Sequence, residues 1–217
     1  MEVDNYDKKV LILGAHGKIA RLAEKEFLEK TDDSLKLFLR KASRLNPVQP
    51  DRETVIEGDA TNLEQLVAAM QGVDAVYANL AGGDIKQQAQ AVVKAMDKVG
   101  IKRLVWISTL GIYDEVPGKF GEWNNSTLGS YITNYRAAAD VIEDSDLDYT
   151  IVRPAWLTNN DEVDFEVTQK GEVFKGTEVS RKSIAHIVVG LIQNNTELKH
   201  SIGVNKPNTD GDKPSWY

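Results

Sequence analysis

Short apolar segments alternate with amphipathic segments along the first two thirds of the chain. Residues 10–13 are all large aliphatics, and residues 18–30 then carry apolar side chains at helical spacing, so the pattern predicts a buried strand followed by a helix. The same alternation continues to residue 194. It predicts further strands at residues 35–39, 54–57, 74–82, 103–109 and 148–154, and helices at residues 61–72, 86–99, 126–145 and 183–194.

Two details define the ends of these predicted helices. Thr61 stands three residues before Glu64, which is the spacing of a capping box, and Gly72 and Gly100 are residues that commonly end helices. Ser180 or Ser183 is expected to cap the last helix.

The order of these elements predicts the fold class. Strands that are apolar on both faces and alternate with helices form a parallel sheet covered on both sides, so we expect an α/β, Rossmann-like doubly wound fold. No internal repeat or linker divides the chain, and residues 1–217 are expected to form a single domain. The less regular residues 155–180 are expected to form a small lobe on the substrate side.

Composition narrows the function classes only modestly. The chain has 217 residues, of which 41% are hydrophobic and 27% charged, and these fractions are typical of globular proteins. A net charge of −7 argues against a nucleic-acid partner. The absence of cysteine excludes thiol chemistry and suits a cytoplasmic protein, and no segment is apolar enough to predict a membrane span. We expect a small-molecule substrate, a monomer or homo-oligomer, and no metal site.

The stretch from Leu11 to Ala20, "LILGAHGKIA", has the features of a dinucleotide-binding loop. Gly14 permits a tight turn out of the strand, Gly17 lets the backbone approach a pyrophosphate, and Ala20 lets the helix pack close to the sheet. The helix N-terminus would add free N–H groups and a partial positive charge. The alternative is a strand-to-helix turn that binds no ligand.

Polar residues follow the next three predicted strands, where ligands of such folds bind. Arg40, with Lys41 and Arg44 behind it, stands where an NAD-specific site would have a carboxylate, and these cations suit a 2′-phosphate, or else form a solvated turn. Asp59 could accept a hydrogen bond from the adenine amino group, and residues 79–82 would let a ribose come close.

With these motifs the chain resembles the short-chain dehydrogenase/reductase superfamily, in its atypical NAD(P)H-binding, NmrA-like and flavin-reductase-like branch. The resemblance runs from "LILGAHGKIA" through "GDATN", "ANLAG", "LVWISTLGIY" and "LDYTIVRPAWLT" to "VSRKSIAHIVVGLI". It implies an NAD(P)H cofactor, and Arg40 with its basic neighbours favours NADP(H) over NAD(H). The residues expected to bind it are Gly14, Ala15, His16, Gly17, Lys18, Ile19, Arg40, Lys41, Asp59, Ala60, Asn79, Leu80, Ala81, Gly82, Arg153 and Pro154.

The catalytic residues of this superfamily are only partly present. Its reductases use a Ser or Thr, here Ser108 or Thr109, and a Tyr four residues before a Lys that lowers the phenol pKa. Tyr131 is the expected tyrosine, but Tyr135 then stands at the lysine position. If Tyr135 were the family tyrosine instead, that position would be Ala139.

Without the lysine, ketone reduction is disfavoured, whereas a flavin or quinone can accept hydride at one atom and a proton from water. The leading hypothesis is therefore an NADP(H)-dependent oxidoreductase of a small planar acceptor. The alternatives are a non-catalytic NADP-binding redox sensor and a nucleotide-sugar epimerase-like enzyme. Trp156 and Leu157 are expected either to cover the acceptor or to belong to the core, and the aromatic residues at the end of the chain either to fold against the domain or to contact a partner.

Overall fold

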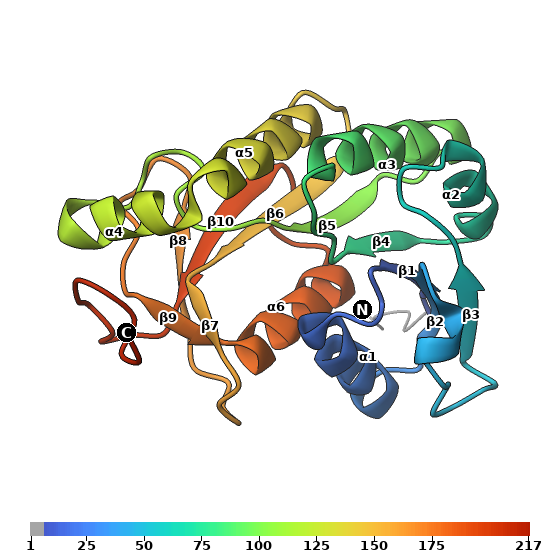
Figure 1. Cartoon of the computed structure of the whole chain (residues 1–217). Helices are drawn as coiled ribbons and strands as arrows, with labels where there is room; N and C mark the ends of the chain where they lie inside the picture. Colours follow the sequence, from blue (N-terminus) through green and yellow to red (C-terminus); the bar gives the residue numbers. More distant parts are fainter. Residues whose placement is uncertain (1–6) are drawn as a thin grey trace, which may run out of the picture.

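The computed structural model describes residues 7–217 and contains a central eight-stranded sheet with helices on both faces (Figure 1). The strand order is β3-β2-β1-β4-β5-β6-β10-β8, in which the first six strands follow the order of a doubly wound dinucleotide-binding fold. The strands of this sheet are Lys9–Leu13 (β1), Ser34–Leu39 (β2), Glu53–Glu57 (β3), Ala75–Ala78 (β4), Arg103–Ile107 (β5), Asp148–Pro154 (β6), Glu166–Gln169 (β8) and His200–Asn205 (β10). The predicted fold class is confirmed.

Six α-helices cover the sheet, and Figure 1 shows α3 and α5 above it, with α1 and α6 below. Their bounds are Lys18–Lys30 (α1), Leu63–Ala69 (α2), Ile85–Val99 (α3), Gly118–Leu128 (α4), Ser130–Glu143 (α5) and Arg181–Asn194 (α6), and a single 3-10 turn, η1, spans Ala42–Arg44.

The sheet separates two hydrophobic cores, because successive strand side chains point to opposite faces. In β1, Val10 and Ile12 belong to the core under α1 and α6, whereas Leu11 and Leu13 belong to the core under α2, α3 and α5. Burial on both faces explains why β1, β4 and β5 are almost continuously apolar.

The last third of the chain departs from the simple alternation. Strand β10 pairs parallel to β6, and β8 pairs antiparallel to β10 at the edge of the sheet. Within residues 155–180, two short strands, Trp156–Thr158 (β7) and Glu178–Ser180 (β9), form a separate parallel pair. The sequence pattern predicted none of the strands β7 to β10.

The structure corrects two predicted helices. The residues 126–145 form not one helix but the end of α4 and all of α5, which meet at Gly129 with φ +52°, a conformation that favours glycine. Helix α2 is capped by Asn62, whose side chain accepts from the Gln65 N–H, rather than by Thr61, and it ends before Gly72. Ser180 caps α6, as one of the two alternatives predicted.

No helix within residues 7–217 has the length and apolar character needed to cross a bilayer. Residues 1–6, which the sequence analysis included in the expected single domain, lie outside the residues that the structure describes.

Candidate functional site

A pocket of about 520 Å³ lies at the carboxyl ends of β1, β2 and β4. Nine of the residues predicted to bind the cofactor line it: Gly14, His16, Gly17, Lys18, Arg40, Ala60, Asn79, Leu80 and Ala81. The topology brings these residues together from four separate strand ends, as expected for a doubly wound sheet. We call this the cofactor pocket.

The loop between β1 and α1 depends on its two glycines. Gly14 has φ +73°, and a Cβ there would lie 2.1 Å from the Asn79 carbonyl oxygen. A Cβ on Gly17 would lie 2.1 Å from the Asn79 Nδ2 atom. Both glycines therefore make room for Asn79, which follows β4. The sequence predicted glycine here only for the tight turn and for the close approach of a pyrophosphate, and the contact with Asn79 is a further reason why larger residues do not fit.

Helix α1 begins at this loop with its first amides free of any capping side chain. Gly17 is the N-cap, and the first turn contains no acidic residue. These N–H groups and the partial positive charge of the helix end form a site suited to an anion. Ala20 is fully buried where α1 packs on the sheet. Its small side chain was expected to allow this close packing.

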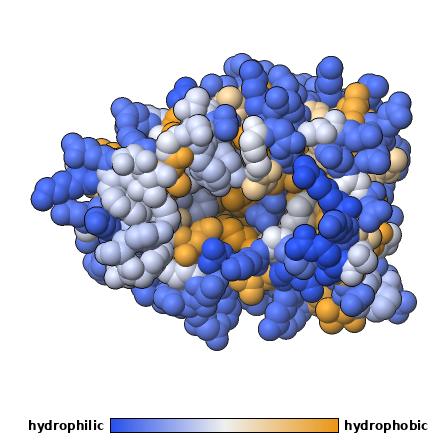
Figure 2. Space-filling model, viewed as in Figure 1, coloured by the Kyte–Doolittle hydropathy of each residue, from blue (hydrophilic) through white to orange (hydrophobic). Residues whose placement is uncertain are grey.

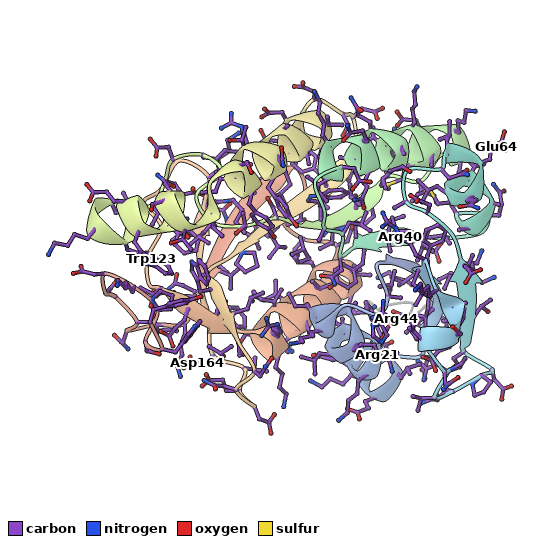
Figure 3. The ribbon with its side chains drawn as sticks, in the orientation of Figure 1. Arg21, Arg40, Arg44, Glu64, Trp123 and Asp164 are labelled. Atoms are coloured by element: carbon purple, nitrogen blue, oxygen red, sulfur yellow. The ribbon has the colours of Figure 1, made fainter. Side chains whose placement is uncertain are left out.

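Two arginines line the far end of the cofactor pocket. Arg40 follows β2, and Arg44 ends the turn η1. Figure 3 shows both side chains beside the β2 end, and the same region of Figure 2 is strongly hydrophilic. The Arg40 guanidinium lies 3.8 Å from the nearest oxygens of Asp59 and Asp84 and is 66% exposed. These long, exposed pairs leave it free to bind a phosphate.

Asp59 lies next to Arg40 rather than on the pocket wall. Its Oδ1 accepts from the Thr61 N–H and hydroxyl at 2.8 and 2.7 Å, and these bonds hold the pKa of the carboxyl below its usual value. Its other oxygen faces Arg40, and its proposed bond to adenine stays a prediction.

Four further residues predicted to bind the cofactor do not line the cofactor pocket. Ala15 and Ile19 are buried in the core, and the Ala15 N–H donates to the Phe38 carbonyl at 3.1 Å. Lys41 is the exposed N-cap of η1, and Gly82 turns the chain toward α3 with φ +116°.

Arg153 and Pro154 do not lie in the cofactor pocket. The Arg153 side chain is 1% exposed, forms a buried ion pair with Glu115, and donates to the Ser201 hydroxyl at 2.9 Å. This placement gives Arg153 a structural role between β6 and β10, and the structure does not bring its guanidinium to the predicted site. The Pro154 carbonyl accepts from the Leu110 N–H.

The predicted catalytic residues occupy the ends of β5 and α5. Ser108 and Thr109 are buried directly after β5, and the Ser108 hydroxyl has no hydrogen-bond partner within residues 7–217. A buried hydroxyl without a partner is unusual, and Ser108 lines neither the cofactor pocket nor a neighbouring one, so its catalytic role stays a prediction.

The two tyrosines of α5 stack on each other with ring centroids 4.0 Å apart. Tyr135 donates weakly, at 3.4 Å, to the carbonyl of Leu80, which lines the cofactor pocket. Partial burial raises the pKa of Tyr131, and burial together with Tyr131 raises that of Tyr135. Both shifts are opposite to the one that an activating lysine would cause, and the catalytic roles of Ser108, Thr109 and Tyr131 stay predictions.

An aromatic cluster lies beyond the end of β6. Trp156 packs against Trp123 of α4 and against Tyr217, with ring centroids 4.9 and 5.6 Å apart, and its Nε1–H donates to the Asn124 Oδ1 at 2.8 Å. The end of the chain therefore folds against the protein. Figure 2 shows this face hollowed near its centre, with hydrophobic residues on the floor of the hollow.

Four residues that line the cofactor pocket were not named by the sequence: Phe38, Leu39, Gly58 and Gln88. Arg44, which the sequence placed with Arg40 among the cations suited to a 2′-phosphate, also lines it. Gln88 carried a weaker signal, a polar residue on the buried side of α3, where its amide donates to the Ala81 carbonyl at 2.8 Å.

Comparison with known proteins identifies a family for most of the chain. Residues 14–195 match the model of a family described as NAD(P)H-binding. Among solved structures, a Rossmann-fold NAD(P)-binding family protein from Shigella flexneri is 41% identical, with a TM-score of 0.83 over 96% of this chain and 98% of that one.

Two further proteins are similar over nearly their whole length. A short-chain dehydrogenase/reductase from Veillonella parvula, solved in complex with NADP, is 32% identical with a TM-score of 0.90, over 97% of this chain and 100% of that one. A Bacillus subtilis protein described as an uncharacterized sugar epimerase, YhfK, is 27% identical in an alignment of 202 positions that covers 87% of this chain and 90% of that protein.

Proposed function

This chain belongs to the NAD(P)H-binding family, and from that premise we propose that it is an NADP(H)-dependent oxidoreductase that reduces a small planar acceptor such as a flavin or quinone. One observation carries the proposal. The cofactor pocket combines a glycine loop and two arginines, while the adjacent tyrosine pair lacks an activating lysine.

The residues of the cofactor pocket fit a phosphorylated dinucleotide. The free amides of α1 suit the pyrophosphate, and Gly14 and Gly17 leave no side chain between those amides and the pocket. Arg40 and Arg44 suit the 2′-phosphate, because a guanidinium offers paired donors and a permanent charge. The similar Veillonella parvula structure, which contains NADP, supports this assignment.

When bound, the cofactor supplies a hydride. The chain's own residues provide no acidified phenol, because the pKa values of both Tyr131 and Tyr135 are raised. An acceptor that gains its proton from water suits this arrangement better than a ketone does.

The proposal is tested by following NADPH oxidation with a panel of flavins, quinones, enals and simple ketones. We expect turnover with at least one flavin or quinone, and slower or no turnover with ketones. Oxidation of NADPH no faster than without protein, for every acceptor in the panel, would contradict the proposal.

A non-catalytic NADP-binding sensor is the second candidate, favoured by the same raised tyrosine pKa values. It predicts tight NADPH binding without turnover, and a partner protein retained in only one redox state of the cofactor. An epimerase-like activity, suggested by the Bacillus subtilis relative, would instead retain NADP⁺ and interconvert nucleotide sugars without net oxidation.

A further inference from the structure

A second pocket, of about 490 Å³, lies between the N-terminal ends of α1 and α6. It shares His16 and Lys18 with the cofactor pocket, so the two pockets adjoin at the loop between β1 and α1. Its lining consists of His16, Lys18, Arg21, Leu22, Asn159, Asn160, Asp161, Arg181 and Lys182. The proposed function gives this second pocket no role.

The lining of this pocket is strongly cationic. It holds four permanent cations, Lys18, Arg21, Arg181 and Lys182, and a single carboxylate, Asp161. Asp161 is paired with Lys182 at 2.6 Å. Within residues 7–217, neither Lys18 nor Arg181 forms an ion pair.

Arg181 and Arg21 are held in place without losing their charge. The Arg181 guanidinium donates to the neutral Asn159 Oδ1 at 2.8 Å. Arg21 pairs with Glu24 at 3.0 Å, although burial raises the pKa of this carboxyl to about 8.

Two of these cations, Lys18 and Arg181, stand at helix N-termini, where a positive charge is electrostatically unfavourable. Lys18 and Arg181 are the first residues of α1 and α6, and neither helix has an acidic residue in its first turn. A cation at the positive end of a helix is unfavourable, and a bound anion would reverse this effect. Asp161 and Glu24 pair with Lys182 and Arg21, so the two helix ends bring more cations than carboxylates to one pocket.

We propose that this second pocket binds a phosphate or carboxylate group carried by the acceptor, so that the substrate is an anionic planar molecule rather than a neutral one. This inference rests on the proposed function for the acceptor's planar part. Because the pocket shares His16 and Lys18 with the loop that lines the cofactor pocket, an acceptor anchored there by its anionic group would lie next to the bound cofactor.

Equilibrium binding to the NADP⁺-loaded protein tests this inference without requiring turnover. Two matched pairs of probes are compared: riboflavin with its phosphate FMN, and naphthoquinone with a naphthoquinone carboxylate. We expect the anionic member of at least one pair to bind about tenfold more tightly than the neutral member, and the pair that shows the preference identifies phosphate or carboxylate.

Variants then locate the preference. R181Q should reduce it to less than about threefold, R181K should retain part of it, and K102A, which removes an exposed cation far from this pocket, should leave it unchanged.

Three results would overturn the inference: equal or absent binding of neutral and anionic members in both pairs, a preference that survives R181Q, or a loss of NADP⁺ affinity in R181Q as large as the loss for the anionic probes. Failure of the proposed function looks different, because it leaves NADPH unoxidised whether or not the anionic probes bind.

Discussion

At the scale of single residues, Arg40 is the side chain on which cofactor choice depends. Its position at the end of β2 and its long contacts with Asp59 and Asp84 leave its charge available to a 2′-phosphate. Replacing Arg40 with Ala should raise the dissociation constant for NADPH about tenfold or more and change that for NADH little, since charge-assisted hydrogen bonds contribute roughly 1.5–3 kcal/mol. Titration calorimetry with both nucleotides checks this, and equal losses would show that Arg40 does not read the 2′-phosphate.

Glu24 gives a residue-level prediction about stability and pH. Folding raises the pKa of this 2%-exposed carboxyl from 4.5 to about 8, mainly by burial, and its Oε1 has no partner within the described residues. The stability that this group contributes is therefore fully present below pH 4.5 and is lost as the pH rises through about 8. E24Q, which cannot ionise, should lose less stability over that window.

Thermal unfolding at about pH 5 and about pH 9 measures this difference. The melting temperature of the unaltered protein should fall by about 5 °C more than that of E24Q. E29Q, on the exposed side of the same helix, is the matched control and should behave like the unaltered protein. Parallel pH profiles for the unaltered protein and E24Q would refute a buried, neutral Glu24.

At the scale of elements, α5 is where this chain departs from a typical reductase. Its Tyr131 and Tyr135 stack beside the cofactor pocket, and neither is acidified. Y131F should therefore change kcat for a flavin or quinone by less than about threefold, because no proton transfer depends on the phenol. A hundredfold loss of kcat with unchanged NADPH affinity would instead make Tyr131 the proton donor.

The helices and strands that the sequence predicted all bury apolar side chains in the two cores on either side of the sheet. Such burial gives a regular spacing of apolar residues within a short segment, and this spacing was enough to predict β1 to β6 and most of the helices. Strands β8 and β10 pair with each other at the sheet edge through contacts distant in sequence, and β10 contains Gly203, which weakens a strand pattern. The break at Gly129 likewise depends on a backbone conformation that an apolar pattern does not record.

The cofactor pocket was predictable because strand ends in a doubly wound sheet meet at one edge. The residues missed there follow from contacts instead: Gln88 reaches the pocket only because its helix packs over β4. Arg153 shows the reverse case, since its partners Glu115 and Ser201 lie far from it in sequence and draw its side chain into the interior.

At the scale of the whole molecule, one sheet links the cofactor pocket to the last strands of the chain. We propose that the chain is a single folding unit in which residues 155–180 take part through β8, while β7 and β9 form a separate pair outside the main sheet (Figure 1). Scanning calorimetry should then give one transition, shifted upward by NADPH. Two transitions, only one of which responds to NADPH, would show that the last third unfolds separately.

The central claim is that hydride leaves NADPH in this pocket for a planar acceptor. A single-turnover experiment tests it most directly: the protein loaded with one equivalent of NADPH is mixed without oxygen with a flavin or quinone, and the absorbance of the reduced nicotinamide is followed. We predict that the whole equivalent is oxidised, faster than in protein-free solution, and that deuterium on one face of the nicotinamide C4, but not on the other, slows the reaction. NADPH that stays bound and reduced in the presence of every acceptor would contradict the account.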